Sequence, residues 1–439
     1  MSTNSFIEKL HQYFINARQK ICIDTRKLQS GSLFFALKGN NFNANEFAHK
    51  AVENGCSYAI VDEEKYLTSD KIILVNNTLK TLQQLANHHR QQYNIPVLAI
   101  TGSNGKTTHK ELINAVLSKK YTTLATEGNL NNHIGVPLTL LRITSQHQFA
   151  IIEMGANHQG EIEELCNIAN PNFGLITNIG KAHLEGFGGE EGVKKGKSEM
   201  YKFLKVNGSK IFINGDDDVL NQLAISNDKI TYGCKLIYDT IGKDFTNSQT
   251  VSFKFTERYG EKDWSKLPLI NTQITGGYNF INCLAAVCVG HYFKVEDELI
   301  AKSLVSYVPQ MNRSQLLNTG NNTLILDAYN ANPNSMKVAI ENFSNYMAEN
   351  KLAILGDMFE LGEYSVEEHK KIIELVIEKK LNTTIFVGNE FFKLNPNNYT
   401  VFKTVEECKE YLKILSLKNH TLLIKGSRSM KMENLIDVL

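Results

Sequence analysis

The chain has 439 residues, a formal net charge of +1 and 42% hydrophobic residues. This length exceeds what one hydrophobic core serves, so we expect roughly two to four domains. The near-neutral charge gives no electrostatic basis for nucleic-acid binding, and no run approaches the roughly 20 apolar residues of a membrane span. Seven scattered cysteines without a CxxC pair, and an opening segment unlike a signal peptide, predict a cytoplasmic protein with reduced thiols.

The first block alternates short apolar runs with helical patterns. SLFFAL, YAIVDE and IILVN predict strands, and EFAHKAVENG predicts a helix that ends at Gly55. A longer amphipathic helix, TLKTLQQLANHHRQQY, then leads to Pro96, which marks a domain boundary. We therefore predict an N-terminal domain over residues 1–92.

The segment PVLAITGSNGKTT, residues 96–108, carries the most specific signal. A short buried strand is followed by a glycine-containing loop and a helix, the arrangement that holds phosphates through backbone N–H groups and a helix N-terminus. Ile100 stands where the longer form of this loop has a glycine, so the loop is a shortened GxxGKT variant, and an ordinary strand-to-helix turn is the alternative. The predicted nucleotide contacts are Gly102, Ser103, Asn104, Gly105, Lys106, Thr107 and Thr108.

The central block, residues 93–312, continues with the buried strands FAII and GLITNI, in the alternation typical of a parallel sheet. Ligands gather at the carboxyl ends of such strands. Glu153 and His183 follow two strand ends, and with Thr107 they supply a carboxylate, an imidazole and a hydroxyl. The spacing around Lys197 leaves a solvated helical charge and a functional role equally open.

Two groups of asparagines offer amides that give and accept hydrogen bonds. Asn129, Asn131 and Asn132 suit a polar or phosphorylated substrate, or simply form an Asn-rich turn. Asn279 and Asn282 lie three apart on one face of a predicted helix, where they can read an adenine edge or cap the helix.

The last block, residues 313–439, contains four strand-like runs, TLILD, KLAILGD, TTIFVG and TLLIKGS, each followed by an amphipathic segment. This repeat predicts a separate doubly wound domain. Lys425 and Arg428, past the last strand, are suitable donors to a substrate carboxylate, or are surface charges.

Eight strings together resemble the Mur ligases, the ATP-dependent enzymes that form amide bonds of the peptidoglycan peptide: DTRKLQSGSLFFALKG, TGSNGKTT, GNLNNHIGVPLTLL, EMGANHQGEI, NIGKAHLEGFGG, DAYNANPNS, GDMFELG and KGSRSM. They are most similar to the member that adds D-alanyl-D-alanine to UDP-N-acetylmuramoyl-tripeptide. The resemblance implies an α/β monomer in which a central parallel-sheet ATPase domain lies between an N-terminal UDP-sugar domain and a C-terminal Rossmann-like, doubly wound domain.

The resemblance also implies roles for individual residues. Lys106 and Thr107 would hold ATP and Mg²⁺, with Glu153 and His183 as further metal ligands and Lys197 as a lysine carbamylated by carbon dioxide. Lys106, Glu153, His183 and Lys197 are therefore the expected catalytic residues. Further implied contacts are Asn279, Asn282, Arg313, Asp327, Tyr329 and Asn330 for ATP, and Thr25 and Arg26 for the uridine nucleotide.

The chain departs from the family pattern at two places. Tyr278 stands where a histidine is common, and Asn43, Ala44 and Asn45 replace an Asp-Gly-His string, so base and uridine contacts stay open. A sister ligase that adds one amino acid, to folate or to a shorter muropeptide, is the nearest alternative function, and a nucleotide-switch module is another. No motif reads the third tripeptide residue, diaminopimelate or lysine.

Overall fold

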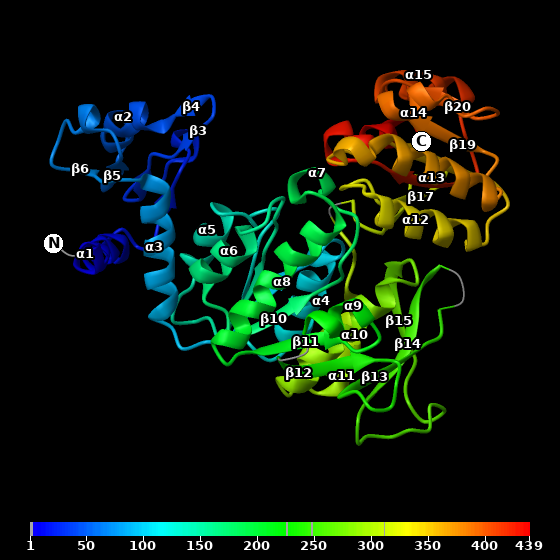
Figure 1. Ribbon diagram of the computed structural model, residues 1–439, viewed down its shortest axis with the longest axis horizontal. Helices are drawn as coiled ribbons and strands as arrows, with labels where there is room; N and C mark the ends of the chain where they lie inside the picture. Colours follow the sequence, from blue (N-terminus) through cyan, green and yellow to red (C-terminus); the bar gives the residue numbers. More distant parts are fainter. Residues whose placement is uncertain (1–2, 225–226, 247–248, 311) are drawn as a thin grey trace. The chain divides into compact units, whose positions relative to one another are not determined.

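The computed structural model describes residues 3–224, 227–246, 249–310 and 312–439 (Figure 1). Two compact units are distinguished, and each is described by itself. The first comprises residues 1–99, 121–156 and 161–174, and the second comprises residues 100–120, 157–160 and 175–439. None of the helices in the described ranges has the length and apolar character that crossing a membrane requires.

The N-terminal region contains a four-stranded parallel sheet in the order β1-β2-β5-β6. Its strands are β1 (Ile21–Cys22), β2 (Leu33–Phe35), β5 (Tyr58–Val61) and β6 (Ile72–Leu74), and a small hairpin is formed by β3 (Lys38–Gly39) and β4 (Phe42–Asn43). The three strands expected from the apolar runs are confirmed as β2, β5 and β6.

The helices of this region are α1 (Thr3–Asn16), α2 (Ala48–Glu53) and α3 (Thr78–Gln91). The chain leaves α2 through Gly55, whose φ of +98° explains the glycine. Helix α3 begins at Asn77, whose side chain accepts a hydrogen bond from the Lys80 N–H at 2.8 Å. Both predicted helices are therefore present.

A nine-stranded sheet follows, in the order β15-β14-β13-β12-β11-β10-β7-β9-β8. Its strands are β7 (Val97–Thr101), β8 (Thr123–Ala125), β9 (Phe149–Glu153), β10 (Phe173–Ile176), β11 (Lys210–Asn214), β12 (Asp228–Gly233), β13 (Thr240–Asp244), β14 (Thr250–Glu257) and β15 (Ile270–Thr275). The expected parallel pairing is found between β8 and β9, β11 and β12, and β12 and β13, whereas β13–β14 and β14–β15 pair antiparallel toward one edge. Strand β14 alternates buried and partly exposed residues along most of its length, as antiparallel strands with one solvated face do, whereas β7 and β9 are buried throughout.

The helices of the central region are α4 (Lys106–Leu117), α5 (Gly135–Leu140), α6 (Glu161–Ala169), α7 (Leu184–Phe187), α8 (Glu190–Val206), α9 (Asp218–Leu223), α10 (Asn279–Tyr292) and α11 (Asp297–Ser306). Helix α4 starts directly after β7 and the loop of residues 102–105, so the predicted strand, loop and helix are present in that order.

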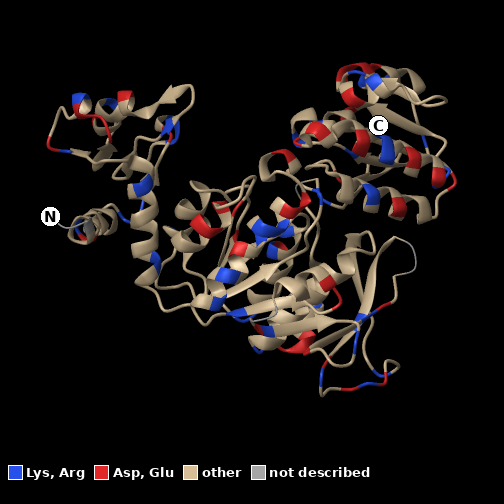
Figure 2. Cartoon of the chain, viewed as in Figure 1, with Lys and Arg blue, Asp and Glu red and all other residues tan. Residues whose placement is uncertain are grey.

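The C-terminal region is a six-stranded sheet in the order β16-β17-β21-β18-β19-β20, parallel except for the β16–β17 pair. Its strands are β16 (Gln315–Asn318), β17 (Thr323–Leu326), β18 (Lys351–Gly356), β19 (Thr384–Val387), β20 (Thr400–Phe402) and β21 (Thr421–Lys425). Its helices are α12 (Pro333–Asn345), α13 (Ser365–Glu378), α14 (Asn389–Leu394) and α15 (Val405–Leu415). They carry interspersed charges of both signs (Figure 2). The four predicted strands are confirmed as β17, β18, β19 and β21, and the α/β fold class with a doubly wound C-terminal domain is confirmed with them.

Candidate nucleotide and ligase site

The loop between β7 and α4 needs its two glycines for different reasons. Gly105 has a φ of +77°, the left-handed conformation, immediately before α4. Gly102 has a φ of +139°, and a Cβ there would lie only 2.0 Å from the Thr177 Oγ1. Gly102 therefore allows close approach of the loop to the segment after β10, and Gly105 allows the turn into the helix.

This loop is held by hydrogen bonds from the segment after β10. The Asn104 carbonyl accepts from Thr177 Oγ1 at 2.6 Å and from Asn178 Nδ2 at 3.1 Å, and the Asn104 N–H donates to Asn178 Oδ1 at 3.1 Å. Ser103 Oγ donates to the Gly180 carbonyl and accepts from the Gly180 N–H. The segment after β10 therefore helps to fix the loop in place.

Charged and amide side chains converge on the same loop. Lys106 Nζ donates to the Gly102 carbonyl at 2.8 Å. His109 Nδ1 lies 2.9 Å from the Gly105 carbonyl, and burial lowers the pKa of His109 to about 4, so this ring is neutral. Asn282 Nδ2 would be 3.6 Å from a Cβ built on Gly105. The structure thus brings Asn282 to the phosphate loop.

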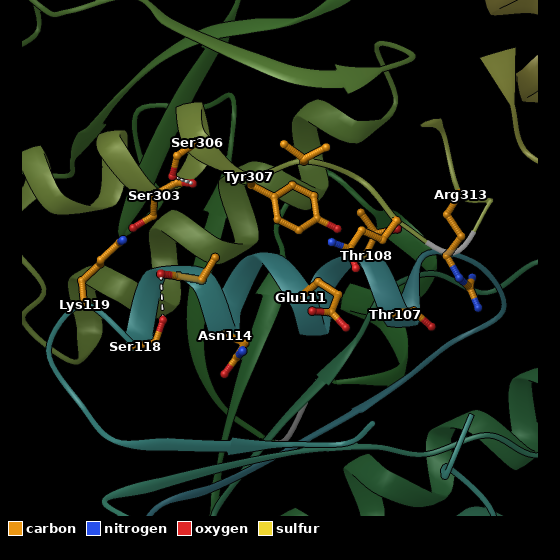
Figure 3. A pocket seen from close by; sticks show the side chains of 13 residues that line it. Thr107, Thr108, Glu111, Asn114, Ser118, Lys119, Ser303, Ser306, Tyr307 and Arg313 are labelled. Atoms are coloured by element: carbon orange, nitrogen blue, oxygen red, sulfur yellow. Dashed lines mark hydrogen bonds between the residues drawn. The ribbon is translucent and has the colours of Figure 1, made fainter. Parts of the chain in front are cut away.

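A cavity of about 500 Å³ lies along α4, between this helix and the end of α11 with the segment after it (Figure 3). Thr107, Thr108 and Glu111 line it from α4, and Tyr307 and Arg313 line it from the other side. This volume lies in the range typical of small-molecule sites. The cavity is therefore large enough for a nucleoside next to a phosphate-binding loop.

Asn279 and Asn282 are both buried. Asn279 Nδ2 donates to the Thr275 carbonyl at 2.7 Å, and Asn282 Nδ2 donates to Asn279 Oδ1 at 2.6 Å. Tyr278, at the position where a histidine was expected, hydrogen-bonds through its hydroxyl to Ser314 Oγ at 2.7 Å. Asn279 does not cap α10 through its side chain, and its role toward a base stays a prediction.

Within the first compact unit, Glu153 ends β9 and is buried. Its Oε1 accepts a hydrogen bond from Asn131 Nδ2 at 2.8 Å, and its Oε2 is buried without a hydrogen-bond partner among the described residues. Asn132 Oδ1 accepts from the N–H groups of Ile134 and Gly135, while Asn129 is exposed. Of the three asparagines, Asn131 orients Glu153 and Asn132 stabilises the turn before α5.

Within the second unit, His183 has a left-handed backbone, with a φ of +54°, and its Nδ1 contacts a carboxylate oxygen of Glu360. Lys197, on α8, is buried, with its Nζ 5.0 Å from the centre of the Phe187 ring. A Cβ at Gly196 would be 2.5 Å from that ring, which explains why α8 carries a glycine there. A solvated charge at Lys197, the alternative that its spacing left open, does not fit this burial.

The sequence-predicted residues of the C-terminal region form two groups. Arg313 Cζ lies 3.5 Å from the centre of the Tyr329 ring. Lys425 is buried, and its Nζ donates to Asp327 Oδ2 at 2.6 Å and to the Asn330 carbonyl at 3.2 Å. Binding of a substrate carboxylate by Lys425 stays a prediction, and it would compete with this internal ion pair.

Arg428 is half-exposed at its side chain and pairs with Glu433 at 2.8 Å. In the N-terminal region, exposed Arg26 forms two side-chain hydrogen bonds with Asp24, at 2.8 and 2.9 Å, and these bonds lower the Asp24 pKa to about 2. Thr25 starts the short 3₁₀ helix Thr25–Lys27 beside them. Uridine contacts by Thr25 and Arg26 stay a prediction.

The departure at residues 43–45 builds a polar network within the N-terminal region. Asn43 Nδ2 donates to Glu63, and buried Asn45 donates to Asp62, in both cases at 2.9 Å. Lys38 Nζ lies 2.8 Å from Asp62 and 2.9 Å from Glu63. The two asparagines therefore have structural partners of their own.

Comparison with known proteins decides the family. The model of the Mur ligase middle domain matches residues 100–290, and that of the Mur ligase, glutamate ligase domain matches residues 312–428. A UDP-N-acetylmuramoyl-tripeptide–D-alanyl-D-alanine ligase of Bacillus subtilis is 35% identical, over 97% of this chain and 94% of the relative. The chain belongs to the Mur ligase family.

Solved structures agree with this Mur ligase assignment. A crystal structure of MurF from Acinetobacter baumannii superposes with a TM-score of 0.86 at 32% identity, covering 95% of this chain and 92% of the other. MurF of Thermotoga maritima, solved in complex with ADP, gives a TM-score of 0.84 at 25% identity, covering 96% and 97%.

Sequence reasoning missed several residues around the site of this Mur ligase. Thr177 and Asn178, which hold the phosphate loop, and Tyr307, which lines the cavity, were not singled out. Asn332 also belongs to this group, since its Nδ2 donates to Asn104 Oδ1 at 2.6 Å. For Thr177 and Asn178, the available signal in the sequence was their position next to a strand end.

Proposed function

We propose that this chain uses ATP to join D-alanyl-D-alanine to UDP-N-acetylmuramoyl-tripeptide, giving the pentapeptide precursor of peptidoglycan. The observation that carries the proposal is the similarity over nearly the whole chain to a relative named for that reaction. The phosphate loop and its neighbouring cavity support ATP as the nucleotide.

In this proposal residues 1–92 bind the UDP-sugar, residues 93–312 bind ATP, and residues 313–439 close over the nucleotide. The protein would act as a cytoplasmic monomer. None of the seven cysteines forms a disulfide in the described residues, as the reducing conditions of that compartment favour.

The chemistry must turn a carboxylate into an electrophile. Transfer of the γ-phosphoryl group to the tripeptide carboxylate gives an acyl phosphate and ADP, and attack by the D-alanyl-D-alanine amine then forms the amide and releases phosphate. Lys106, at the start of α4, would offset negative charge on the migrating group. Because acyl phosphates hydrolyse, closure of the C-terminal domain would exclude water before the amine attacks.

The residues fit a magnesium ion, which the family implies. The buried Oε2 of Glu153 accepts no hydrogen bond from the described residues, and a metal ion would supply the partner that this oxygen lacks. Thr107, Glu153, His183 and carbamylated Lys197 would hold the ion. When bound, it would neutralise charge on the phosphates.

Phosphate release from ATP tests the function directly. The assay uses UDP-MurNAc-tripeptides containing diaminopimelate or lysine, each with and without D-alanyl-D-alanine, in the wild type and in Lys106→Ala. We expect release that depends on both substrates and disappears in the folded Lys106→Ala variant. Release that needs a single amino acid instead would support a sister ligase, and nucleotide binding without turnover would support a switch module.

Carbamylation is tested at Lys197. We expect Lys197→Ala to lose activity at least about tenfold, because a metal-binding anion is removed. Bicarbonate should restore wild-type activity after decarbamylation and leave the variant unchanged. Lys194→Ala is the matched control, because Lys194 lies on the same helix and pairs with Glu191 near the surface. Full activity of Lys197→Ala would contradict the proposal.

A further inference from the structure

Arg313 and Tyr329 form a stacked pair at the beginning of the C-terminal region. The 3.5 Å between the Arg313 Cζ and the ring centre is the contact distance of two planar groups, so the guanidinium lies flat on the ring. The Tyr329 N–H donates to the Asn312 carbonyl at 3.2 Å, which holds the tyrosine beside the residue that precedes the arginine. The pair is therefore fixed through both its side chains and its backbone.

The stacked guanidinium faces a ligand site. Arg313 lines the 500 Å³ cavity together with Thr107 and Thr108, two hydroxyl residues in the first turn of α4, just after the phosphate loop (Figure 3). Its Nε is buried and has no hydrogen-bond partner among the described residues. A guanidinium that stacks on a ring keeps its N–H donors in its own plane, where the ring cannot accept them. These donors are available to an anion in the cavity.

We propose that Tyr329 is a positioning residue, whose ring holds the Arg313 guanidinium against the phosphates of the bound nucleotide. This inference rests on the proposed function and alters one expectation from the sequence, which placed Tyr329 among the residues that contact ATP. The aromatic face performs this role, and the phenol oxygen does not take part. Arg428, 5.5 Å from the same ring, does not share the role because it pairs with Glu433.

Two substitutions at Tyr329 distinguish the contribution of the aromatic ring to ADP affinity from that of the hydroxyl. ADP affinity, measured by titration calorimetry on the full chain, should fall about 3- to 30-fold in Tyr329→Leu, the range that a cation–π contact supplies. Tyr329→Phe should stay within about twofold of the wild type, because it keeps the ring. Thermal unfolding checks that both variants fold, and Tyr329→Met replaces Tyr329→Leu if that variant unfolds. Equal loss in the Leu and Phe variants would overturn the inference.

A double-mutant cycle with Arg313→Met shows whether Tyr329 acts through the arginine. In the Arg313→Met background, Tyr329→Leu should cause no further loss of ADP affinity. Additive losses would mean that Tyr329 contacts the nucleotide directly and would overturn the positioning role. Equal ADP affinity of wild type and Tyr329→Leu would overturn this inference alone, whereas a wild type that binds no ADP would overturn the proposed function and the inference with it.

Discussion

At the scale of single residues, the conformation of the phosphate loop depends on the absence of a Cβ atom at Gly102. An added Cβ would lie 2.0 Å from Thr177 Oγ1 and 2.9 Å from the Thr177 N–H nitrogen, and the second of these atoms belongs to the backbone. The strand end cannot move aside without breaking the hydrogen bonds that fix Asn104. The position therefore tolerates no side chain.

We predict that Gly102→Ala lowers the free energy of unfolding by about 2 kcal/mol more than Gly160→Ala and abolishes measurable ADP binding. Gly160 is the matched control, because its φ of +88° is also positive and no atom lies within 4 Å of its Cβ position. Chemical denaturation and calorimetry of the two variants measure both effects. Equal stability of the two variants would show that the loop can relax.

The limits of sequence reading are clearest for residues. Gly105, Lys106 and Thr107 follow one another, so a local pattern reveals them. The contact of Thr177 with Asn104 spans 73 residues, and that of Asn332 with Asn104 spans 228 residues. Such pairs depend on how strand ends meet in the folded sheet, and no spacing in the chain encodes them.

At the scale of elements, apolar runs predicted most strands of the parallel regions, because a strand buried on both faces is uniformly apolar. The edge strands β16 and β20 were missed, since each has only half-buried or exposed residues. At the start of helix α12, one side chain has both a local role and a distant one. Asn332 Oδ1 caps the helix by accepting from the Ser335 N–H at 2.9 Å, while its Nδ2 donates to the phosphate loop.

The packing of α1 on α3 contains a pair of buried histidines. His11 Nε2 lies 3.0 Å from His89 Nδ1, and His89 Nε2 lies 2.8 Å from the Ile143 carbonyl. Since a carbonyl only accepts, His89 donates to Ile143 through Nε2 and accepts from His11 at Nδ1, so the His89 ring is neutral. Burial, with the neighbouring His89 and His88, lowers the pKa of His11 to about 4, and burial also lowers that of His89.

Protonation should therefore weaken this helix pair. The folded pKa is depressed, so the unfolded chain binds more protons, and the contribution to stability is present above pH 6.5 and lost as the pH falls toward 4. We expect the melting temperature of the wild type to fall more steeply over this window than that of His11→Gln, which keeps a donor toward His89. His49→Gln, at an exposed histidine of α2, is the control. Parallel curves for wild type and His11→Gln would contradict the prediction.

At the scale of the whole molecule, the second compact unit contains several contacts between the loop after β10 and the C-terminal region. Lys181 Nζ lies 2.8 Å from Glu368 Oε1 on α13, and the Lys181 N–H donates to Asn334 Oδ1 on α12 at 3.1 Å. His183 pairs with Glu360 on the same side of this junction. These contacts are the features that would stabilise the closed arrangement needed for amide formation.

We predict that Lys181→Met lowers kcat about three- to tenfold while ADP affinity changes little, because an ion pair of the closed form is lost. Small-angle scattering with ADP and both substrates should show a larger radius of gyration for the variant than for the wild type. Lys194→Met, which removes a surface lysine of α8, is the control. An unchanged kcat in Lys181→Met would mean that the Lys181–Glu368 ion pair is not needed for catalysis.

The contact of Lys106 Nζ with the Gly102 carbonyl has a consequence for which ligands the loop admits. This contact, at 2.8 Å, restricts the lysine side chain to one position along the loop, and fixing a lysine side chain costs up to about 2 kcal/mol. An incoming group must compete with an uncharged carbonyl for the ammonium. A negatively charged phosphate oxygen can replace the Gly102 carbonyl as the acceptor of the Lys106 ammonium, whereas an uncharged sugar or peptide oxygen cannot. The loop is therefore expected to select ligands by their charge.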